Sequence, residues 1–327
     1  MNRRRFTCAI SAAAALGAIS CVWPSLVRAQ AWPPGRVNIV VPFPAGAATD
    51  ITGRLVAEKL TQLWGQPVTV ENKGGGNGLP GAEAVARARP DGLTLLLTSA
   101  MTHSVNPWLY DKLPYHPLND FEAISQFGRL PFVVLVPSDS SLKTLGDLTA
   151  LLKAEPGRHN FGAGSLPARI ASEMYRQIAG VEAAHIGYKS NPQAFPDLIS
   201  GRLTFMTIDT TNGRLQIDGG KLRGLVVTTQ QRDPKLPQVP SATEVGLPDF
   251  LITTWTGFYA PKGTPRELVA RISRDIAAAC NDAQLLVRFD GLGGRPITST
   301  PDEFAAFTRS ELERWGKIIR NANLKLD

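Results

Sequence analysis

A short loop of small residues is the segment of this sequence best suited to hold an anion. The apolar run 36–42 (RVNIVVP) is followed by the loop 43–49 (FPAGAAT), and apolar residues recur at helical spacing from Asp50 onward. Small side chains let a ligand approach the backbone, and the first turn of a helix offers N–H groups that have no partner within the helix. The segment Ala45 to Thr49 therefore predicts an anion-binding site at the start of a helix.

Asp50 stands at the end of this loop, and two roles are open for its carboxylate. It can strengthen the helix start through the helix dipole, or it can contact a cationic group of a ligand. The segment Ala45 to Thr49 contains no Lys or Arg. Backbone N–H groups, together with hydroxyls and waters, are therefore expected to hold an anion here.

A second loop repeats the same arrangement later in the chain. The segment 161–165 (FGAGS) follows a short strand pattern and precedes a helical pattern with Pro167 near its first position. Opposed to the first loop across a cleft, it would supply a second set of N–H donors, which suits a ligand with two negative charges. A larger side chain at Ala47 or Gly164 should then obstruct the ligand and abolish binding. Replacing Arg169 by a neutral residue should reduce binding less.

The sequence carries no recognisable pattern for catalysis, metal binding or cofactor binding. It has no G-x-S-x-G, H-E-x-x-H, C-x-x-C or Walker loop, and its four histidines are scattered. The formal G-x-G-x-x-G at 76–81 is separated from its strand and contains Pro80, so it is a weak dinucleotide signal. His103 follows a buried strand and either contacts a ligand or bonds to the backbone of its own loop. We expect no cofactor and no metal.

Strands and helices alternate along the chain, which predicts an α/β fold with a largely parallel sheet. Strands are expected at 36–42, 67–71 and 93–98, and helices at 50–64 and 80–89. The alternation resumes with segments at 132–137, 144–154, 160–162, 167–179, 183–188, 193–200, 203–208, 213–217 and 222–229. A Pro-rich connector, 234–248, leads to a strand at 251–260 and to two closing helices. Each of these begins with Thr-Pro and a Glu, at Thr264 and Thr300, which predicts two capping boxes.

Two apolar, proline-ended strands, around 132–137 and 251–260, flank the middle of the chain. If both cross between lobes, residues 30–133 plus 252–327 form one lobe and residues 134–251 form the other. Two lobes joined by two strands enclose a cleft that can close on a solute. Two consecutive domains joined by a single connection are the alternative.

The first 29 residues predict an export signal. Three arginines, Arg3 to Arg5, precede an apolar run that ends in Val27-Arg28-Ala29. A membrane anchor is the alternative, but Ser, Thr and Cys interrupt the run. A twin-arginine signal and a lipoprotein signal at Cys21 are variants of an export signal. Cleavage is expected near Ala29.

Cleavage would leave Cys280 as the single cysteine, so no internal disulfide can form. Its helical spacing with Ile272 and Ile276 predicts a small buried side chain rather than a reactive thiol.

The composition excludes disorder and offers no reason to expect a nucleic-acid partner. The 327 residues are 43% hydrophobic, which suffices for one large or two medium cores. The net charge is +7, but the first 29 residues hold four of the 35 Lys and Arg and no acid, so the rest carries 31 against 28, or +3. Such a mixed surface lacks the clustered positive charge that binds nucleic acid.

Several longer motifs resemble one known family. They are VPFPAGAATD at 41–50, PVTVENK at 67–73, ARPDGLTLL at 88–96, NPWLY at 106–110, LPYHP at 113–117, YKS at 188–190 and TTWTGFYAPKGTP at 253–265. From about Trp32 to the C-terminus the chain is similar to the Bug family, the extracytoplasmic solute receptors of tripartite tricarboxylate transport systems. The resemblance implies a type II periplasmic-binding fold and a small carboxylate-bearing solute held between the lobes.

On matching positions, the resemblance implies two groups of residues near the ligand. They are Phe43, Ala45, Ala47, Ala48 and Asp50 from one lobe, and Gly162, Ala163, Gly164, Ser165, Ser190, Asn191 and Asp209 from the other. It also implies a periplasmic protein, expected to be monomeric, whose partners are the solute and the membrane subunits of the transporter. Three positions depart from the family pattern, since Ala47 and Ser190 replace frequent glycines and Arg169 stands where His is common.

Two other functions share this architecture. A periplasmic hydrolase or transferase would use the same cleft, but it needs a nucleophile beside a base, and the sequence shows no such pair. A sensory binding module would differ in having a signalling protein as its partner.

Overall fold

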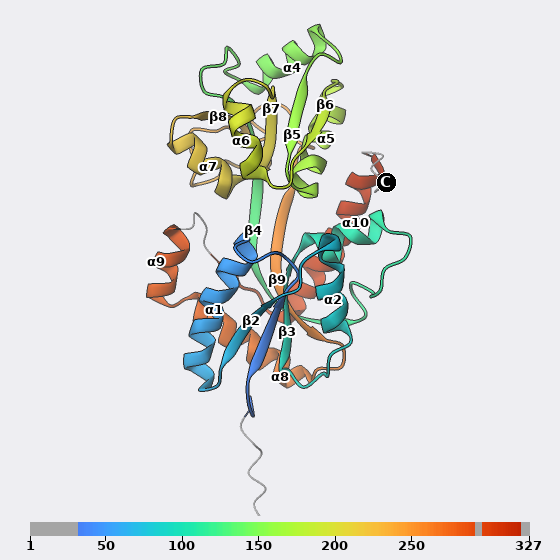
Figure 1. The fold of residues 1–327 in the computed structure, drawn as a ribbon, viewed down its shortest axis with the longest axis vertical. Helices are drawn as coiled ribbons and strands as arrows, with labels where there is room; N and C mark the ends of the chain where they lie inside the picture. The colour runs from blue at the N-terminus through green and yellow to red at the C-terminus, as the bar shows by residue number, and fades with distance from the viewer. Residues whose placement is uncertain (1–31, 292–295, 322–327) are drawn as a thin grey trace, which may run out of the picture.

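Buried β-branched and leucine-rich runs at the start of the chain form an open parallel sheet. A computed structural model describes residues 32–291 and 296–321, and it is drawn in Figure 1. The first elements are β1 (Val37–Val41), α1 (Ala48–Trp64), β2 (Val68–Asn72), the 3₁₀ turn Gly76–Gly78, α2 (Leu79–Ala86) and β3 (Thr94–Ser99). β2 and β3 lie parallel to β1, one on each side of it.

Two strands run between an upper and a lower lobe in Figure 1, and they are β4 (Phe121–Pro137) and β9 (Thr253–Pro261). The first part of β4, up to Pro131, pairs antiparallel with β9, which in turn pairs antiparallel with β3. From Phe132 onward β4 pairs with strands of the upper lobe instead. The backbone amide of Ile252, just before β9, donates to the carbonyl oxygen of Thr228 at 3.2 Å. The chain therefore crosses between the lobes twice.

The upper lobe repeats the βα alternation between the two crossings. Its elements are α4 (Leu145–Ala154), β5 (Asn160–Ala163), α5 (Leu166–Ala179), β6 (Ala184–Gly187), α6 (Asn191–Ile199), β7 (Phe205–Asp209), α7 (Thr210–Asp218) and β8 (Leu222–Val227). β5 lies parallel between β6 and β7, and the upper part of β4 lies antiparallel to β7 and β8. The strand order through both lobes is β2-β1-β3-β9-β4-β7-β5-β6, with β8 on β4.

Helices at the C-terminal end return to the lower lobe. They are α8 (Arg266–Cys280), α9 (Ala283–Gly291) and α10 (Pro301–Asn321). At α10 the predicted capping box is present, because Glu303 accepts from the amide of Thr300 at 2.8 Å and donates its own amide to Thr300 Oγ1 at 3.3 Å. At α8 the prediction is wrong: Pro265 is the N-cap, and the Thr264 hydroxyl donates to the carbonyl of Pro261 at 2.7 Å.

The two lobes share part of their apolar interior. One cluster of buried residues belongs to the lower lobe and contains Ile39, Leu60 and Ile276, and another belongs to the upper lobe and contains Val133, Leu198 and Ile208. The largest cluster includes Tyr175 on α5 together with Trp315 and Ile318 on α10. Helix α10 of the lower lobe also contacts α5 of the upper lobe. The lobes are therefore packed together along the side of α5 and α10.

Most elements agree with the expectations from sequence, and a few do not. Strand β4 begins at Phe121 rather than near 132, because its first part becomes a strand by pairing with β9, far along the chain. The π-helix Met101–Val105, the short α3 (Asn106–Leu109) and α9 were not expected either. Cys280 is buried on α8, as predicted. None of the helices in the described ranges is long and apolar enough to cross a membrane.

Candidate functional site

The strand register brings the two predicted loops to facing edges of the lobes. In the lower lobe, Ser99 at the carboxyl end of β3 pairs with Thr256, close to the start of β9. In the upper lobe, Asp209 at the carboxyl end of β7 pairs with Phe132, where β4 passes from one lobe to the other. β1 is parallel to β3 and β5 is parallel to β7, so all four strands end toward the crossing. Ligands of open α/β sheets bind at such edges.

The loop after β1 is held in one conformation by its own backbone. Gly46 adopts a φ of +82°, which favours glycine, and its amide donates to Oδ2 of Asp50 at 2.8 Å. The amide of Ala47 donates to the carbonyl of Pro44 at 3.2 Å, and Ala47 is the N-cap of α1 without any side-chain cap. Ala45 is exposed and Phe43 is half-buried. The first amides of α1, from Ala48 and Thr49, have no acceptor within the helix.

Asp50 has a structural role in this loop. Its side chain is 4% exposed, and Oδ1 accepts from Asn72 Nδ2 at 2.9 Å and from Arg54 Nη2 at 2.9 Å. Burial raises the pKa of Asp50, but the hydrogen bonds from Gly46, Arg54 and Asn72 outweigh it and hold the pKa below its ordinary value. Both oxygens are thus engaged by the protein. Of the two roles left open by the sequence, the structure supports strengthening of the helix start.

Asn72, at the end of β2, was missed by the sequence reasoning. Its Nδ2 donates to Asp50 and also to the carbonyl of Phe43 at 3.1 Å, and its Oδ1 accepts from Arg54 at 2.9 Å. It therefore joins the loop, α1 and β2. The available signal was its position, because a polar residue at the carboxyl end of a parallel strand next to β1 lies at the edge where ligands bind.

The glycine-rich segment 74–81 supports the loop rather than binding a nucleotide. A Cβ on Gly81 would lie 2.7 Å from Cβ of Pro42, and one on Gly74 would lie 3.3 Å from the carbonyl carbon of Phe43. The distance at Gly81 leaves no room for a Cβ unless its neighbours move, and the distance at Gly74 is shorter than most Cβ contacts. The glycines thus allow this segment to pack directly beneath the start of the loop.

In the upper lobe, only part of the second loop is open to a ligand. Gly162 and Ala163 are buried within β5, and a Cβ on Gly164 would lie 1.9 Å from the carbonyl carbon of Ser190. The amide of Gly164 donates to Oδ1 of Asn191 at 2.8 Å. This amide therefore already has a partner within the protein, and the next amides along the chain are better placed to bind a ligand. Ser165 is the exposed N-cap of α5, and its amide donates to no other described residue.

Ser190, Asn191 and Asp209 lie at two further helix starts on the same edge. Ser190 is the N-cap of α6, and Asn191 holds Gly164 as described above. Asp209 is the N-cap of α7, and its Oδ1 accepts from the amide of Asn212 at 3.0 Å. The side chain of Asn212 donates to both carboxylate oxygens, at 3.1 and 2.9 Å. The charge of Asp209 is thus directed at its own helix.

His103 lies in the core and not at this edge. Its side chain is 0% exposed and stacks on Tyr259, with ring centroids 4.0 Å apart. Nδ1 is 2.8 Å from the hydroxyl of Thr102. Burial lowers the pKa of His103 from 6.5 to about 3, so the imidazole is neutral at physiological pH. The structure thus places it out of reach of a ligand at the strand ends, and its partner is a side chain rather than the backbone.

Arg169 and His185 lie near the second loop. Burial lowers the pKa of His185, and the positive charge of Arg169 lowers it further. Arg169 forms no ion pair with any described carboxylate, and its Nε is buried without a partner. A cation in this position adds to the positive potential of the α5 start.

Two surface pockets, of about 510 and 640 Å³, include none of the predicted site residues. The described residues contain no group of three or more His, Cys, Asp or Glu that could hold a metal ion. The candidate site therefore rests on the facing helix starts of α1 and of α5, α6 and α7.

Two α/β lobes joined by two strands, with helix starts facing each other at the crossing, define a solute-binding protein of the type II periplasmic class. The model of the Tripartite tricarboxylate transporter family receptor matches residues 52–324, and the chain belongs to this family. It is 37% identical over 298 residues to a UPF0065 protein of a Pseudomonas strain, covering 89% of this chain and 88% of that protein. It is 32% identical to the protein BugT of Bordetella pertussis, covering 92% and 93%.

Solved structures with the same fold include ligand-bound receptors. An R. palustris protein with adipate is 28% identical, with a TM-score of 0.80 over 90% of this chain and all of that one. MatC from Rhodopseudomonas palustris with bound malate is also 28% identical, with a TM-score of 0.74 over 88% and 99%. The periplasmic binding protein BugD is 31% identical, with a TM-score of 0.77 over 90% and 100%. These are solute-binding proteins, so the hydrolase, transferase and sensory alternatives are not favoured.

Proposed function

We propose that this chain is a periplasmic receptor that captures a small carboxylate-bearing solute between its lobes and delivers it to a tripartite tricarboxylate-type transporter. The observation that carries the proposal is the pair of facing helix starts, α1 below and α5 above, which the register places at the crossing. Helix starts attract anions. The adipate and malate bound by two similar receptors have the carboxylate chemistry that such a site selects.

Backbone amides are the proposed donors to the carboxylate. On the lower lobe they are those of Ala48 and Thr49, beside the small side chain of Ala47, and on the upper lobe those of Ser165 and Leu166. A hydrogen bond to a charged group contributes about 1.5 to 3 kcal/mol, so about four of them support the roughly 8 kcal/mol of micromolar binding. The remaining polar contacts come from hydroxyls and ordered waters.

The proposed site divides the predicted residues into contacts and supports. We infer that Phe43, Ala45, Ala47, Ser165, Ser190 and Asn191 line the site together with the backbone of Ala48, whereas Asp50, Gly162, Ala163, Gly164 and Asp209 hold its backbone in place. His103 is left out because it is buried in the core. The proposed lobes are residues 30–133 plus 252–327 and residues 134–251.

Residues 1–29 lie outside the described part of the chain. We propose that they are an export signal, cleaved near Ala29, with the twin-arginine route supported by Arg3 to Arg5. The mature receptor is proposed to act as a monomer, with the solute and the membrane subunits of the transporter as its partners.

The test is a thermal-shift screen followed by calorimetry. Mono- and dicarboxylates of two to eight carbons, citrate and aromatic acids are screened, and the best solute is titrated into the wild type, Ala47→Leu and Arg169→Gln. Bulk at Ala47 blocks the approach to the first amides of α1, so we expect a loss of affinity of at least about tenfold without a drop in melting temperature. Arg169→Gln should retain binding.

Normal binding by Ala47→Leu together with loss of binding in Arg169→Gln would show that a side-chain charge recognises the solute, contrary to the proposal. If no carboxylate in the panel raises the melting temperature, the proposed solute class is wrong.

A further inference from the structure

Four consecutive residues of the glycine-rich segment have positive φ angles. The angles are +102° at Gly75, +49° at Gly76, +54° at Asn77 and +85° at Gly78. Asn77 is the single residue other than glycine with a positive φ in the described ranges. Asn adopts this left-handed conformation more readily than most residues, but a fourth glycine would adopt it more readily still. We therefore looked for a role of the Asn77 side chain.

The side chain and the carbonyl of Asn77 are both bonded to residues of the NPWLY motif at 106–110. Nδ2 of Asn77 donates to the hydroxyl of Tyr110 at 2.9 Å, and Nδ2 of the buried Asn106 donates to the carbonyl of Asn77 at 3.0 Å. The amide of Tyr110 in turn donates to the carbonyl of Asn106 at 3.1 Å, at the end of α3. The motif therefore holds the Asn77 turn at two points.

Helix α3 is itself attached to α10. Nε1 of Trp108 donates to the carbonyl of Leu312 at 2.8 Å. The indole ring lies against Gly316, where a Cβ would be 2.3 Å from Cε2 of the ring, and the guanidinium of Arg320 lies 4.6 Å from the centre of the ring. The partners of Asn77 are thus fixed to a long helix of the lower lobe.

On its other side, the glycine-rich segment packs against the strand end that leads into the loop 43–49. The amide of Lys73 donates to the carbonyl of Val41 at 2.9 Å. A Cβ on Gly78 would lie 2.9 Å from Cγ2 of Thr102 and 3.2 Å from Cβ of Pro42. Since Gly78 directly follows Asn77 and is closely packed on Pro42, a shift of the Asn77 turn shifts the start of the loop.

We propose that Asn77 is a positioning residue for the loop 43–49. Its left-handed turn, held by Tyr110 and Asn106, sets the position of the loop through the contact between Gly78 and Pro42. A preorganised loop loses less conformational freedom when a solute binds, so this turn raises solute affinity. The inference rests on the proposed function only for the statement that the solute binds at this loop.

Three variants test the turn. Asn77→Gly keeps the positive φ but removes the hydrogen bond to Tyr110, Asn77→Ala removes the bond and adds backbone strain, and Tyr110→Phe removes the bond from the other side. In the protein without solute, hydrogen exchange in residues 43–49 should become faster in all three variants, most of all in Asn77→Ala. The double variant Asn77→Gly with Tyr110→Phe should exchange no faster than either single variant, because both changes remove one bond.

Calorimetry with adipate and malate, the solutes bound by two similar receptors, gives the second measurement. Affinity should fall at least about threefold in Asn77→Gly and in Tyr110→Phe, and at least about tenfold in Asn77→Ala.

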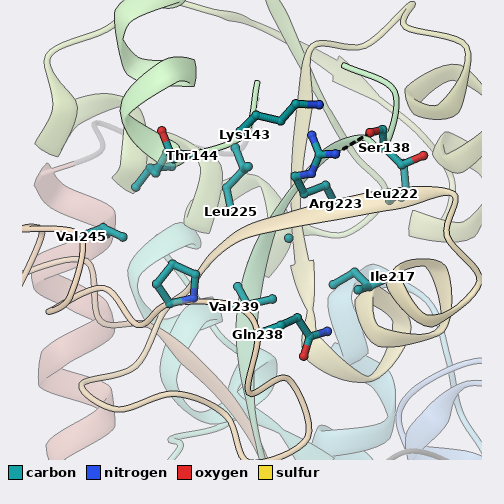
Figure 2. A pocket seen from close by; sticks show the side chains of 13 residues that line it. Ser138, Lys143, Thr144, Ile217, Leu222, Arg223, Leu225, Gln238, Val239 and Val245 are labelled. Carbon is teal, nitrogen blue, oxygen red and sulfur yellow. Dashed lines mark hydrogen bonds between the residues drawn. The ribbon is translucent and has the colours of Figure 1, made fainter. Parts of the chain in front are cut away.

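Two controls remove hydrogen bonds of the upper lobe. Tyr175→Phe is matched to Tyr110→Phe, since the hydroxyl of Tyr175 is 2.8 Å from Oγ1 of Thr149. Arg223→Gln acts at a pocket of about 510 Å³ at the far end of β4 from the crossing, where Figure 2 shows the guanidinium bonded to Ser138. Both should lower the melting temperature and leave exchange in residues 43–49 and solute affinity unchanged.

Unchanged exchange in residues 43–49 of Asn77→Ala and Tyr110→Phe would overturn the proposal, even where adipate or malate binds the wild type. Equal effects of Tyr110→Phe and Tyr175→Phe on this loop would show a general loss of stability and would also overturn it. Wild-type exchange in Asn77→Gly would exclude a role of the side chain. Faster exchange as expected, without binding of any carboxylate to the wild type, would support the positioning of the loop and contradict the proposed function instead.

Discussion

Asp50 accepts hydrogen bonds from the amide of Gly46, from the side chain of Asn72 and from Arg54. Asn72 in turn donates to the carbonyl of Phe43, so one network fixes both ends of the loop that precedes α1. A preorganised loop binds more tightly because less conformational freedom is lost on binding. We therefore regard Asp50 as a positioning residue for the proposed carboxylate site.

The first prediction concerns Asp50→Asn. The substitution removes the charge that Arg54 contacts and replaces one hydrogen-bond acceptor by a donor. The loop 43–49 should therefore become more mobile, and solute affinity should fall by about tenfold or more. Asp147→Asn is the matched control, because Asp147 accepts from the amides of Lys143 and Thr144 at the start of α4 on the upper lobe. It should lower the melting temperature without changing affinity. Equal affinity loss in both variants would contradict a specific role for Asp50.

The second prediction concerns His103 and pH. The imidazole is held neutral in the folded protein, with a pKa lowered by burial to about 3, whereas in the unfolded chain it protonates near 6.5. Between these values the unfolded state binds more protons, so stability should be complete above pH 6.5 and fall by up to about 1.4 kcal/mol per unit as pH decreases.

Denaturant unfolding at pH 7, 6 and 5 provides the measurement. His103→Asn should show a shallower loss of stability than the wild type over this range, where most carboxylates stay ionised. His185, whose pKa is also lowered by burial, leaves some dependence in the variant. Parallel pH profiles for wild type and variant would show that His103 does not contribute.

At the scale of helices and strands, the same four-residue pattern produces two different helix starts. Thr300 and Glu303 form a capping box, but Thr264 donates to Pro261, because β9 ends at Pro261 and brings its carbonyl within 2.7 Å of that hydroxyl. The elements themselves follow from periodicity, and their ranges are mostly recovered from the sequence. Cap geometry depends on the preceding strand, which local sequence does not specify.

The part of β4 before Phe132 shows why some elements could not be predicted. The segment 121–131 includes Gly128, Arg129 and Pro131, which weaken a strand pattern, and the register with β9 shifts twice along it. Pairing with β9, more than a hundred residues later in the chain, makes it a strand nonetheless. Local strand propensity is therefore a weak predictor where long-range pairing determines whether a segment forms a strand. Likewise, no local signal predicts that Asn191 occupies the amide of Gly164.

The third prediction tests the contact between the loops before α5 and α6. A Cβ at Gly164 would overlap the backbone of Ser190, so Gly164→Ala should displace residues 190–191, break the Gly164–Asn191 hydrogen bond and lower stability by about 1 to 3 kcal/mol. Affinity should fall as well. This differs from the expectation that bulk at Gly164 acts only by blocking the solute. Unfolding and calorimetry on Gly164→Ala, beside Ala47→Leu, distinguish the two, since unchanged stability in Gly164→Ala would contradict the packing argument.

On the scale of the whole molecule, the two crossings and the shared apolar cluster restrict how the lobes can move. The hydroxyl of Thr228 accepts from the amide of Phe132 at 2.8 Å and donates to the carbonyl of Ile252 at 2.6 Å, so it ties the outgoing strand to the returning one. The guanidinium of Arg314 on α10 donates to the carbonyl of Leu251. Because packed interiors resist continuous deformation, the side of α5 and α10 should serve as the pivot.

The last prediction is that solute binding closes the lobes about this pivot. In Figure 1, α7 and α9 lie on the side opposite α5 and α10, one on each lobe. Leu215 on α7 and Val287 on α9 are 57% and 72% exposed, so cysteines at both positions can carry spin labels. Cys280 should stay unlabelled, because it is 2% exposed and burial raises the pKa of its thiol to about 12. A chain beginning at residue 30 lacks the other two cysteines.

The control pair places labels at Ile178 on α5 and Arg309 on α10, both of which are exposed. Saturating solute should shorten the distance between Leu215→Cys and Val287→Cys, as measured by pulsed electron resonance, and should change the distance of the control pair much less. A rigid-body rotation about α5 and α10 requires a larger distance change in the Leu215–Val287 pair than in the control pair, since displacement grows with distance from the axis. Equal changes in both pairs would place the pivot elsewhere, and no change in either pair would mean that the solute binds without closure.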